Sequence, residues 1–124
     1  MPWTGISAAG LALAVILGAF GAHGLRGRLD AYSMSVWERA VFYHFVHMLG
    51  ALVASVLART GVFSASAGNW VCGLLVAGVV LFSGTLYLLA ITGIRTLGAV
   101  TPFGGISFIA AWLLLAWSAI SKKS

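Results

Sequence analysis

The stretch 36–58, VWERAVFYHFVHMLGALVASVLA, is apolar enough to cross a membrane, yet it carries Glu38, Arg39, His44 and His47. An ionisable side chain at the centre of a membrane-spanning helix costs about 2.5–3.5 kcal/mol on insertion scales, so such groups normally face protein or water. The other segments of the chain must therefore shield this helix. Ionisable residues within a membrane are also the first place to look for function.

The remainder of the chain is similarly apolar. Of its 124 residues, 61% are hydrophobic and only 7% are charged, and the mean hydropathy is +1.07. Soluble domains carry about 25% charged residues, so this composition predicts an integral membrane protein. The net charge of +5 does not indicate nucleic-acid binding, because the seven Lys and Arg residues are scattered at segment ends. The single cysteine, Cys72, excludes a disulfide within the chain.

Four segments are long enough to cross the hydrocarbon core, which a helix of about twenty residues spans. The connections between them are short and mostly rich in glycine or serine, which implies antiparallel neighbours. The predicted fold is an all-α membrane protein with four transmembrane helices in an antiparallel bundle, forming one domain over residues 1–124. The helices are expected at about 3–22, 36–58, 70–92 and 102–120.

The polar connection 25–35, LRGRLDAYSMS, predicts a short interfacial helix between the first and second crossings, because Leu25, Leu29 and Tyr32 have helical spacing. Ser35 is well placed to cap a helix that begins at Val36, and Glu38 then completes the spacing of a capping box. Glu38 therefore has a structural explanation beside a functional one.

Small residues recur at helix-packing intervals in two of the crossings. In the first they lie at every fourth position, and in the third they lie near its middle. Both sets are expected to let another helix approach closely. They are Gly10, Ala14, Gly18 and Ala22, and Gly73, Ala77, Gly78 and Gly84.

His44 and His47 are three residues apart and share a helix face. Such a pair could hold a metal ion or a haem, but no carboxylate or thiolate on the same face completes a ligand set. We expect these histidines to hydrogen-bond within the bundle, and we expect no metal or other cofactor. Tyr87, near the end of the third crossing, can join an aromatic belt or reach an inward polar partner.

Four blocks of the sequence resemble the DUF423 family of small membrane proteins, also called UPF0382. They follow one another across most of the chain, and the patterns TPxGG, SGxLYxLAxTG and GAxGAHGL are each unusual among apolar helices. The resemblance implies a four-helix integral membrane protein, in bacteria at the inner (plasma) membrane, with no established activity. The blocks are GAFGAHGL at 18–25, WERAVFYHFVH at 37–47, LFSGTLYLLAITG at 81–93 and LGAVTPFGGISFIAAWLLL at 97–115.

The resemblance also singles out individual positions. His44 departs from the family pattern, which more often has an amide there, and Arg39 stands where a small polar residue is expected. The emphasis therefore moves from a His44–His47 pair to His47 together with Glu38 and Tyr87. The polar residues that match are His23, Glu38, Tyr43, His47, Ser83, Tyr87, Thr101 and Pro102, with Gly84, Gly104 and Gly105 as backbone positions.

The matching polar residues collect toward one side of the membrane, where the ends of antiparallel helices are neighbours. We hypothesise a polar cluster of His23, Glu38, His47 and Tyr87, covered by the turn 95–105. No catalytic or metal-binding residue is assigned. The wider candidate set adds Tyr43 and Thr101, with Pro102, Gly104 and Gly105 forming a structural turn.

Two classes of function remain. The first is a structural or accessory membrane component without catalytic activity. The second is a small transporter, channel or ligand-binding protein that uses the polar cluster for protons, ions or a small polar molecule. The first is favoured because 124 residues leave little room for a pore, and an enzyme is least expected because no nucleophile–base pair or phosphate loop is present. The expected partner is the lipid bilayer, with a homo-oligomer or a membrane-protein partner left open and nucleic acid excluded.

Overall fold

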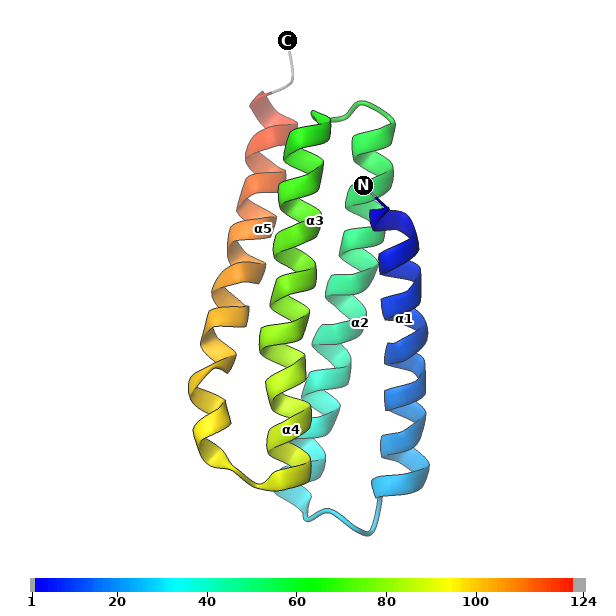
Figure 1. Ribbon diagram of the computed structural model, residues 1–124, viewed down its shortest axis with the longest axis vertical. Helices are drawn as coiled ribbons and strands as arrows, with labels where there is room; N and C mark the ends of the chain where they lie inside the picture. Colours follow the sequence, from blue (N-terminus) through cyan, green and yellow to red (C-terminus); the bar gives the residue numbers. More distant parts are fainter. Residues whose placement is uncertain (1, 122–124) are drawn as a thin grey trace.

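The computed structural model describes residues 2–121, and its four crossings run antiparallel (Figure 1). Each crossing is long and apolar enough to span a membrane, which confirms the predicted four-helix transmembrane bundle. The α-helices are α1 (Trp3–Phe20), α2 (Ala31–Arg59), α3 (Ala65–Val79), α4 (Thr85–Thr92) and α5 (Thr101–Ser121). Two π-helical turns, Gly21–Leu25 after α1 and Val80–Gly84 between α3 and α4, and a 3-10 turn, Arg95–Ala99, complete the described elements.

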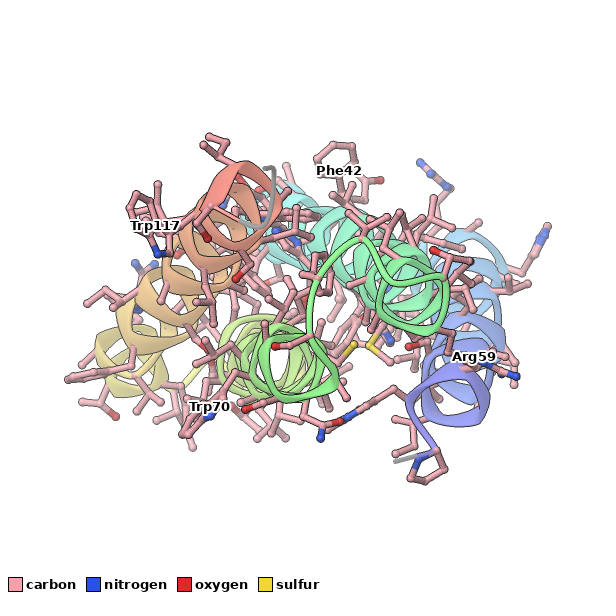
Figure 2. All side chains as sticks on the ribbon, turned by 90° about the horizontal axis from the view of Figure 1, so that it is seen from above. Phe42, Arg59, Trp70 and Trp117 are labelled. Atoms are coloured by element: carbon pink, nitrogen blue, oxygen red, sulfur yellow. The ribbon has the colours of Figure 1, made fainter. Side chains whose placement is uncertain are left out.

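The helices α2 and α3 occupy the middle of the bundle, with α1 packed on α2 and α5 packed on α3 (Figure 2). In the most apolar part of each crossing, 44% and 39% of the residues of the second and third are buried, against 17% in the first and fourth. Phe42, Trp70 and Trp117 point away from the bundle, as side chains that contact lipid do. The helix that carries the ionisable residues is therefore a central one.

The buried apolar side chains form two clusters, one in each half of the bundle. We call the end with the termini and the turn 60–64 the upper end, as in Figure 1, and the end with the turns 26–30 and 93–100 the lower end. The helix α2 contributes residues 36–40 to the lower cluster and residues 48–54 to the upper one. His44 and His47 are buried between these two sets. They form a polar layer between two apolar clusters.

The start of α2 differs from the sequence prediction. Residues 25–35 form no separate interfacial helix, because α2 already begins at Ala31. Asp30 has an extended backbone, and its Oδ1 accepts a hydrogen bond of 2.7 Å from the Ser33 N–H, which is the geometry of an N-cap. Ser35, the predicted cap, lies inside the helix and donates its hydroxyl to the Tyr32 carbonyl. Glu38 is therefore in the third helical turn and takes no part in capping.

Glycines bring the helices into close contact at several points. A Cβ atom at Gly10 would strike Met48, one at Gly78 would strike Phe108, and one at Gly104 would strike the backbone of Phe82. The small-residue stripe of α1 packs as expected at its first three positions, whereas Ala22 is exposed. In the third crossing only Gly78 has the predicted role, since a Cβ atom at Gly73 would meet Trp3 at an ordinary 3.8 Å and one at Gly84 would meet nothing within 4 Å.

The substitution Gly104→Ala should destabilise the protein by about 1–3 kcal/mol, because the added methyl group meets the backbone of Phe82 and pushes α5 away from the third crossing. Gly105→Ala is the matched control, since a Cβ atom there meets nothing within 4 Å, and it should be neutral or stabilise by up to about 1 kcal/mol. Thermal unfolding in detergent, followed by circular dichroism, measures both. Equal unfolding temperatures for the two variants would contradict this packing.

The cap at Asp30 predicts a dependence of stability on pH. The hydrogen bond from the Ser33 N–H holds the pKa of the Asp30 carboxyl below its ordinary value of 3.8. A carboxyl whose pKa is lowered by folding contributes stability above its unfolded pKa, and this contribution is lost as the pH falls through the folded pKa. The advantage of the natural protein over Asp30→Ala should therefore be constant from pH 7 to about pH 5 and diminish below about pH 4.

Thermal unfolding of both proteins at several pH values tests this expectation. Asp30→Asn is the control, because an amide at the N-cap accepts the same hydrogen bond and does not titrate. A difference between the natural protein and Asp30→Ala that stays constant down to pH 3 would mean that the carboxylate does not contribute through its charge.

Candidate functional site at the middle of the bundle

The structure does not bring His23 and Glu38 to His47. His23 is exposed in the π-helical turn after α1. Glu38 is also exposed, and its Oε2 lies 3.8 Å from Arg26 Nη2, in an ion pair whose side chains are 61% and 68% exposed respectively. Glu38 precedes His47 by nine residues, which at 3.6 residues per turn places the two on opposite faces of α2. Helix geometry alone separates them.

His47 points toward α5. Its Nδ1–H donates to the carbonyl of Tyr43, one turn earlier on the same helix, at 2.9 Å. Its ring is stacked on Phe108, with 3.5 Å between ring centroids and an interplanar angle of 11°. Tyr43 is stacked beside it at 5.7 Å. His47 is thus held by its own helix and by aromatic contacts, and it is only 6% exposed.

The family pattern gave His44 less weight than His47, but His44 is the histidine that hydrogen-bonds to another helix. Its Nδ1 lies 2.9 Å from the hydroxyl of Tyr87 on α4, and the residue is 3% exposed. The Tyr87 ring packs on Trp37 with 4.6 Å between centroids, and Trp37 Nε1 donates to the Leu17 carbonyl of α1 at 3.0 Å. This chain of contacts joins α1, α2 and α4. An amide at position 44 would offer Tyr87 a comparable partner.

The π-helical turn Val80–Gly84 adds a second group of polar contacts. Ser83 is fully buried, and its hydroxyl donates to the Ala40 carbonyl of α2 at 2.7 Å. Thr85 donates to the Leu81 carbonyl at 2.6 Å and lies 2.8 Å, Oγ1 to Oγ1, from Thr101. Ser and Thr hydroxyls inside a helix can bond to carbonyls of their own helix. Thr85 does so, but Ser83 connects the third crossing to the second.

The predicted structural turn lies at the start of α5. The helix α5 begins at Thr101, and Pro102 is exposed in its first turn. Arg95, in the preceding 3-10 turn, lies over the ring of Tyr32 at 4.9 Å from its centroid, so this turn contacts the start of α2. Gly104 is buried against Phe82, whereas a Cβ atom added at Gly105 would meet no described atom within 4 Å.

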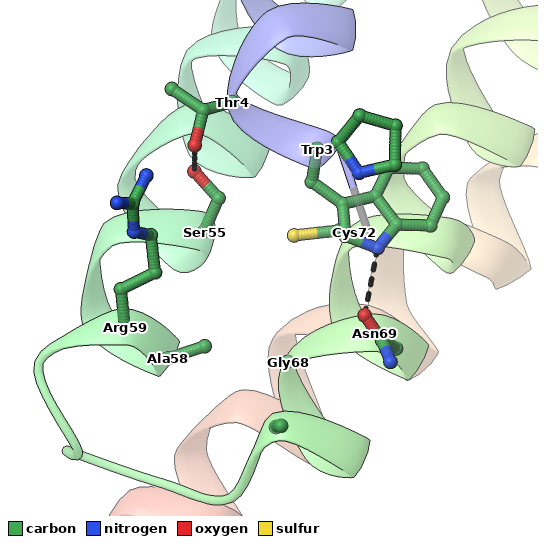
Figure 3. A pocket seen from close by; sticks show the side chains of 10 residues that line it. Trp3, Thr4, Ser55, Ala58, Arg59, Gly68, Asn69 and Cys72 are labelled. Atoms are coloured by element: carbon green, nitrogen blue, oxygen red, sulfur yellow. Dashed lines mark hydrogen bonds between the residues drawn. The ribbon is translucent and has the colours of Figure 1, made fainter.

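A polar hollow of about 380 Å³ lies at the upper end, away from the polar layer (Figure 3). Trp3 Nε1 donates to Asn69 Oδ1 at 3.0 Å, and the hydroxyls of Thr4 and Ser55 are 3.0 Å apart. Arg59 also lines this hollow. Its residues come from the ends of three segments that each resemble ordinary flanking sequence, so no local pattern could have indicated it.

A second hollow of about 290 Å³ is an apolar groove between α1 and the third crossing. Leu13 and Leu17 of α1 line one wall, while Val76, Val80 and Gly84 line the other. His44, Met48 and Tyr87 also line it, so the groove borders the polar layer. Among residues 2–121, none lines both this groove and the polar hollow. The two are separate features.

A family model described as "Protein of unknown function (DUF423)" matches residues 17–105. A UPF0382 membrane protein of Staphylococcus haemolyticus is 52% identical over 103 residues, which make up 83% of this chain and 82% of the relative. The UPF0382 membrane protein YwdK of Bacillus subtilis is 46% identical over 110 residues, or 87% of each chain. No solved structure matches the chain. The part that matches the family model includes both histidines of the polar layer and Tyr87.

The substitution Tyr87→Phe should destabilise the protein by about 0.6 kcal/mol and by no more than about 1.7 kcal/mol, the average and the maximum for hydrogen bonds between membrane helices, because it leaves His44 Nδ1 without its partner. Tyr43→Phe is the matched control, since the hydroxyl of Tyr43 makes no hydrogen bond among the described residues. Thermal unfolding in detergent compares the two. A loss at Tyr43 as large as that at Tyr87 would show that the phenol–imidazole hydrogen bond is not what stabilises the layer.

Proposed function

This chain belongs to the DUF423 family, the UPF0382 membrane proteins, and on that premise we propose that it is a structural or accessory component of the bacterial membrane without catalytic activity. The observation that supports this proposal most is that the polar groups in its interior are engaged in hydrogen bonds. Nearly all of them bond to another helix or to their own backbone. Among the described residues, the only fully buried side-chain nitrogen or oxygen without a partner is the Ser7 hydroxyl.

These hydrogen bonds connect each central helix to its neighbours. Polar side chains hold membrane helices together in this way because lipid chains give apolar faces no preference for one another. Between α1 and α2 the bonds are Thr4–Ser55 and Trp37 to the Leu17 carbonyl, and between α1 and α3 the bond is Trp3–Asn69. Three bonds join α2 to the third crossing: Cys72 to the Ala51 carbonyl, Ser83 to the Ala40 carbonyl, and His44–Tyr87. The helices α3 and α5 are joined by the bond from Ser107 to the Leu74 carbonyl.

The alternative, a transporter or channel, has less support. A proton or ion path needs polar groups that are free to exchange partners and hollows that follow one another across the membrane. Here His44 Nδ1 is within hydrogen-bonding distance of Tyr87 and His47 Nδ1 bonds to its own helix. In the part of the chain that the structure describes, the polar hollow and the apolar groove share no lining residue. These arrangements favour a fixed bundle.

The purified protein, reconstituted in lipid vesicles that contain a pH-sensitive dye, should give proton and potassium fluxes equal to those of protein-free vesicles. In parallel, His47→Leu should lower the unfolding temperature because it removes a stacked and hydrogen-bonded ring. Glu38→Gln should change it little, since exposed ion pairs contribute only about 0–1 kcal/mol.

A flux above the protein-free level that His47→Leu abolishes and Glu38→Gln leaves intact would overturn the structural proposal in favour of transport. Gramicidin added to the same vesicles provides the positive control for the assay. Vesicles that carry equal amounts of each variant keep the comparison independent of expression.

A further inference from the structure

Gly84 has no evident role within the chain. Its backbone is an ordinary right-handed helical one, with φ −58° and ψ −46°. A Cβ atom added to it would meet nothing within 4 Å, in contrast to Gly78 and Gly104 of the same packing region. Glycine inside a helix costs about 0.5–1 kcal/mol relative to alanine. Neither backbone conformation nor packing between described residues compensates for that cost.

Gly84 does, however, line the apolar groove, beside Val80 and Tyr87. The groove lies on the lipid side of the bundle, since Leu13 on one wall is 49% exposed and Val80 on the other is 63% exposed. Its lining runs from Gly10 and Val76 to Leu17 and Tyr87, toward the ends of both segments at the lower end of the bundle. A side chain at position 84 would project into this space.

The side chains that line the groove determine which kind of molecule can bind there. Leucine, valine and methionine side chains provide carbon surfaces, and the hydrogen bond between His44 and Tyr87 engages the polar atoms that face each other there. A polar group in the groove would lose its hydrogen bonds to water without replacement. A single turn of a further helix, about 10–12 Å across and 5.4 Å long, occupies about 420–610 Å³ and therefore exceeds a hollow of about 290 Å³. A single hydrocarbon chain fits both the size and the chemistry.

We propose that the groove between α1 and the third crossing binds one acyl chain of a membrane phospholipid, which lies against Gly84 and ends near His44 at the middle of the membrane. The chain enters from the leaflet at the lower end, because the groove extends in that direction. Contact with two walls and a floor distinguishes this chain from lipid that touches only one exposed helix face. The glycine keeps the space open.

The test uses a phospholipid with a photoreactive diazirine near the end of one acyl chain, mixed into vesicles that contain the full-length protein. After irradiation, mass spectrometry of peptides locates the labelled residues. We expect labelling of the groove walls, Leu13–Leu17 and Val76–Tyr87, to exceed that of the exposed outer face of α5 around Leu113.

Gly84→Leu should reduce labelling of the groove walls at least about fivefold, the equivalent of an overpacking penalty of about 1 kcal/mol, while labelling of α5 stays unchanged. Gly5→Leu is the matched control, because Gly5 is also helical, is exposed, lies outside the groove and has no atom within 4 Å of an added Cβ. It should leave both signals unchanged.

Thermal unfolding in detergent accompanies the labelling and shows whether each variant is folded. Should Gly84→Leu fail to fold, Gly84→Ala takes its place and is expected to give a smaller reduction in the same direction. Groove labelling equal to that of α5 in the natural protein, or unaffected by a substitution at Gly84 that leaves the protein folded, would overturn the proposal. So would labelling that a polyprenyl alcohol displaces and excess phospholipid does not.

Discussion

The cost of placing polar groups at the centre of a membrane determines how this bundle is built. His44 and His47 lie midway along α2, where water cannot compensate for a missing hydrogen bond. The structure meets this requirement by placing α2 centrally, by packing apolar clusters above and below the histidines, and by directing Tyr87 and Ser83 of the third crossing toward the same stretch of α2. The positions of α1 and α5 follow, since each covers one side of the central pair.

The features that the sequence predicted well depend on local properties. Length and apolarity are read within one segment, so the four crossings and their antiparallel order could be inferred before any contact was known. The start of α2 was harder to predict, because both Asp30 and Ser35 are good capping residues. The choice between them depends on whether residues 31–35 are helical. That in turn depends on packing within the lower cluster, which contains Val36 and Leu25.

The candidate site was predicted less well, because it depends on the rotation of each helix about its axis. Glu38 and His47 lie on opposite faces of α2, a relation that the nine-residue spacing already contained. His44 was set aside because of a difference from the family pattern, although it shares the buried face with Ala40, Met48 and Ala51. The π-helical turn Val80–Gly84, the polar hollow and the apolar groove arise from segments far apart in the chain. No single stretch of sequence marks them.

The π-helical turn has a consequence for how this protein tolerates changes in length. A turn that accommodates one residue more than an α-helical turn shifts everything after it by about 100° around the helix axis. Tyr87 follows that turn, so its orientation toward His44 depends on the extra residue. Deleting one residue from 80–84 would restore a regular helix and rotate Tyr87 away from its partner, together with all of α4. The number of residues in this short stretch is therefore constrained as well as the identity of Ser83 and Gly84.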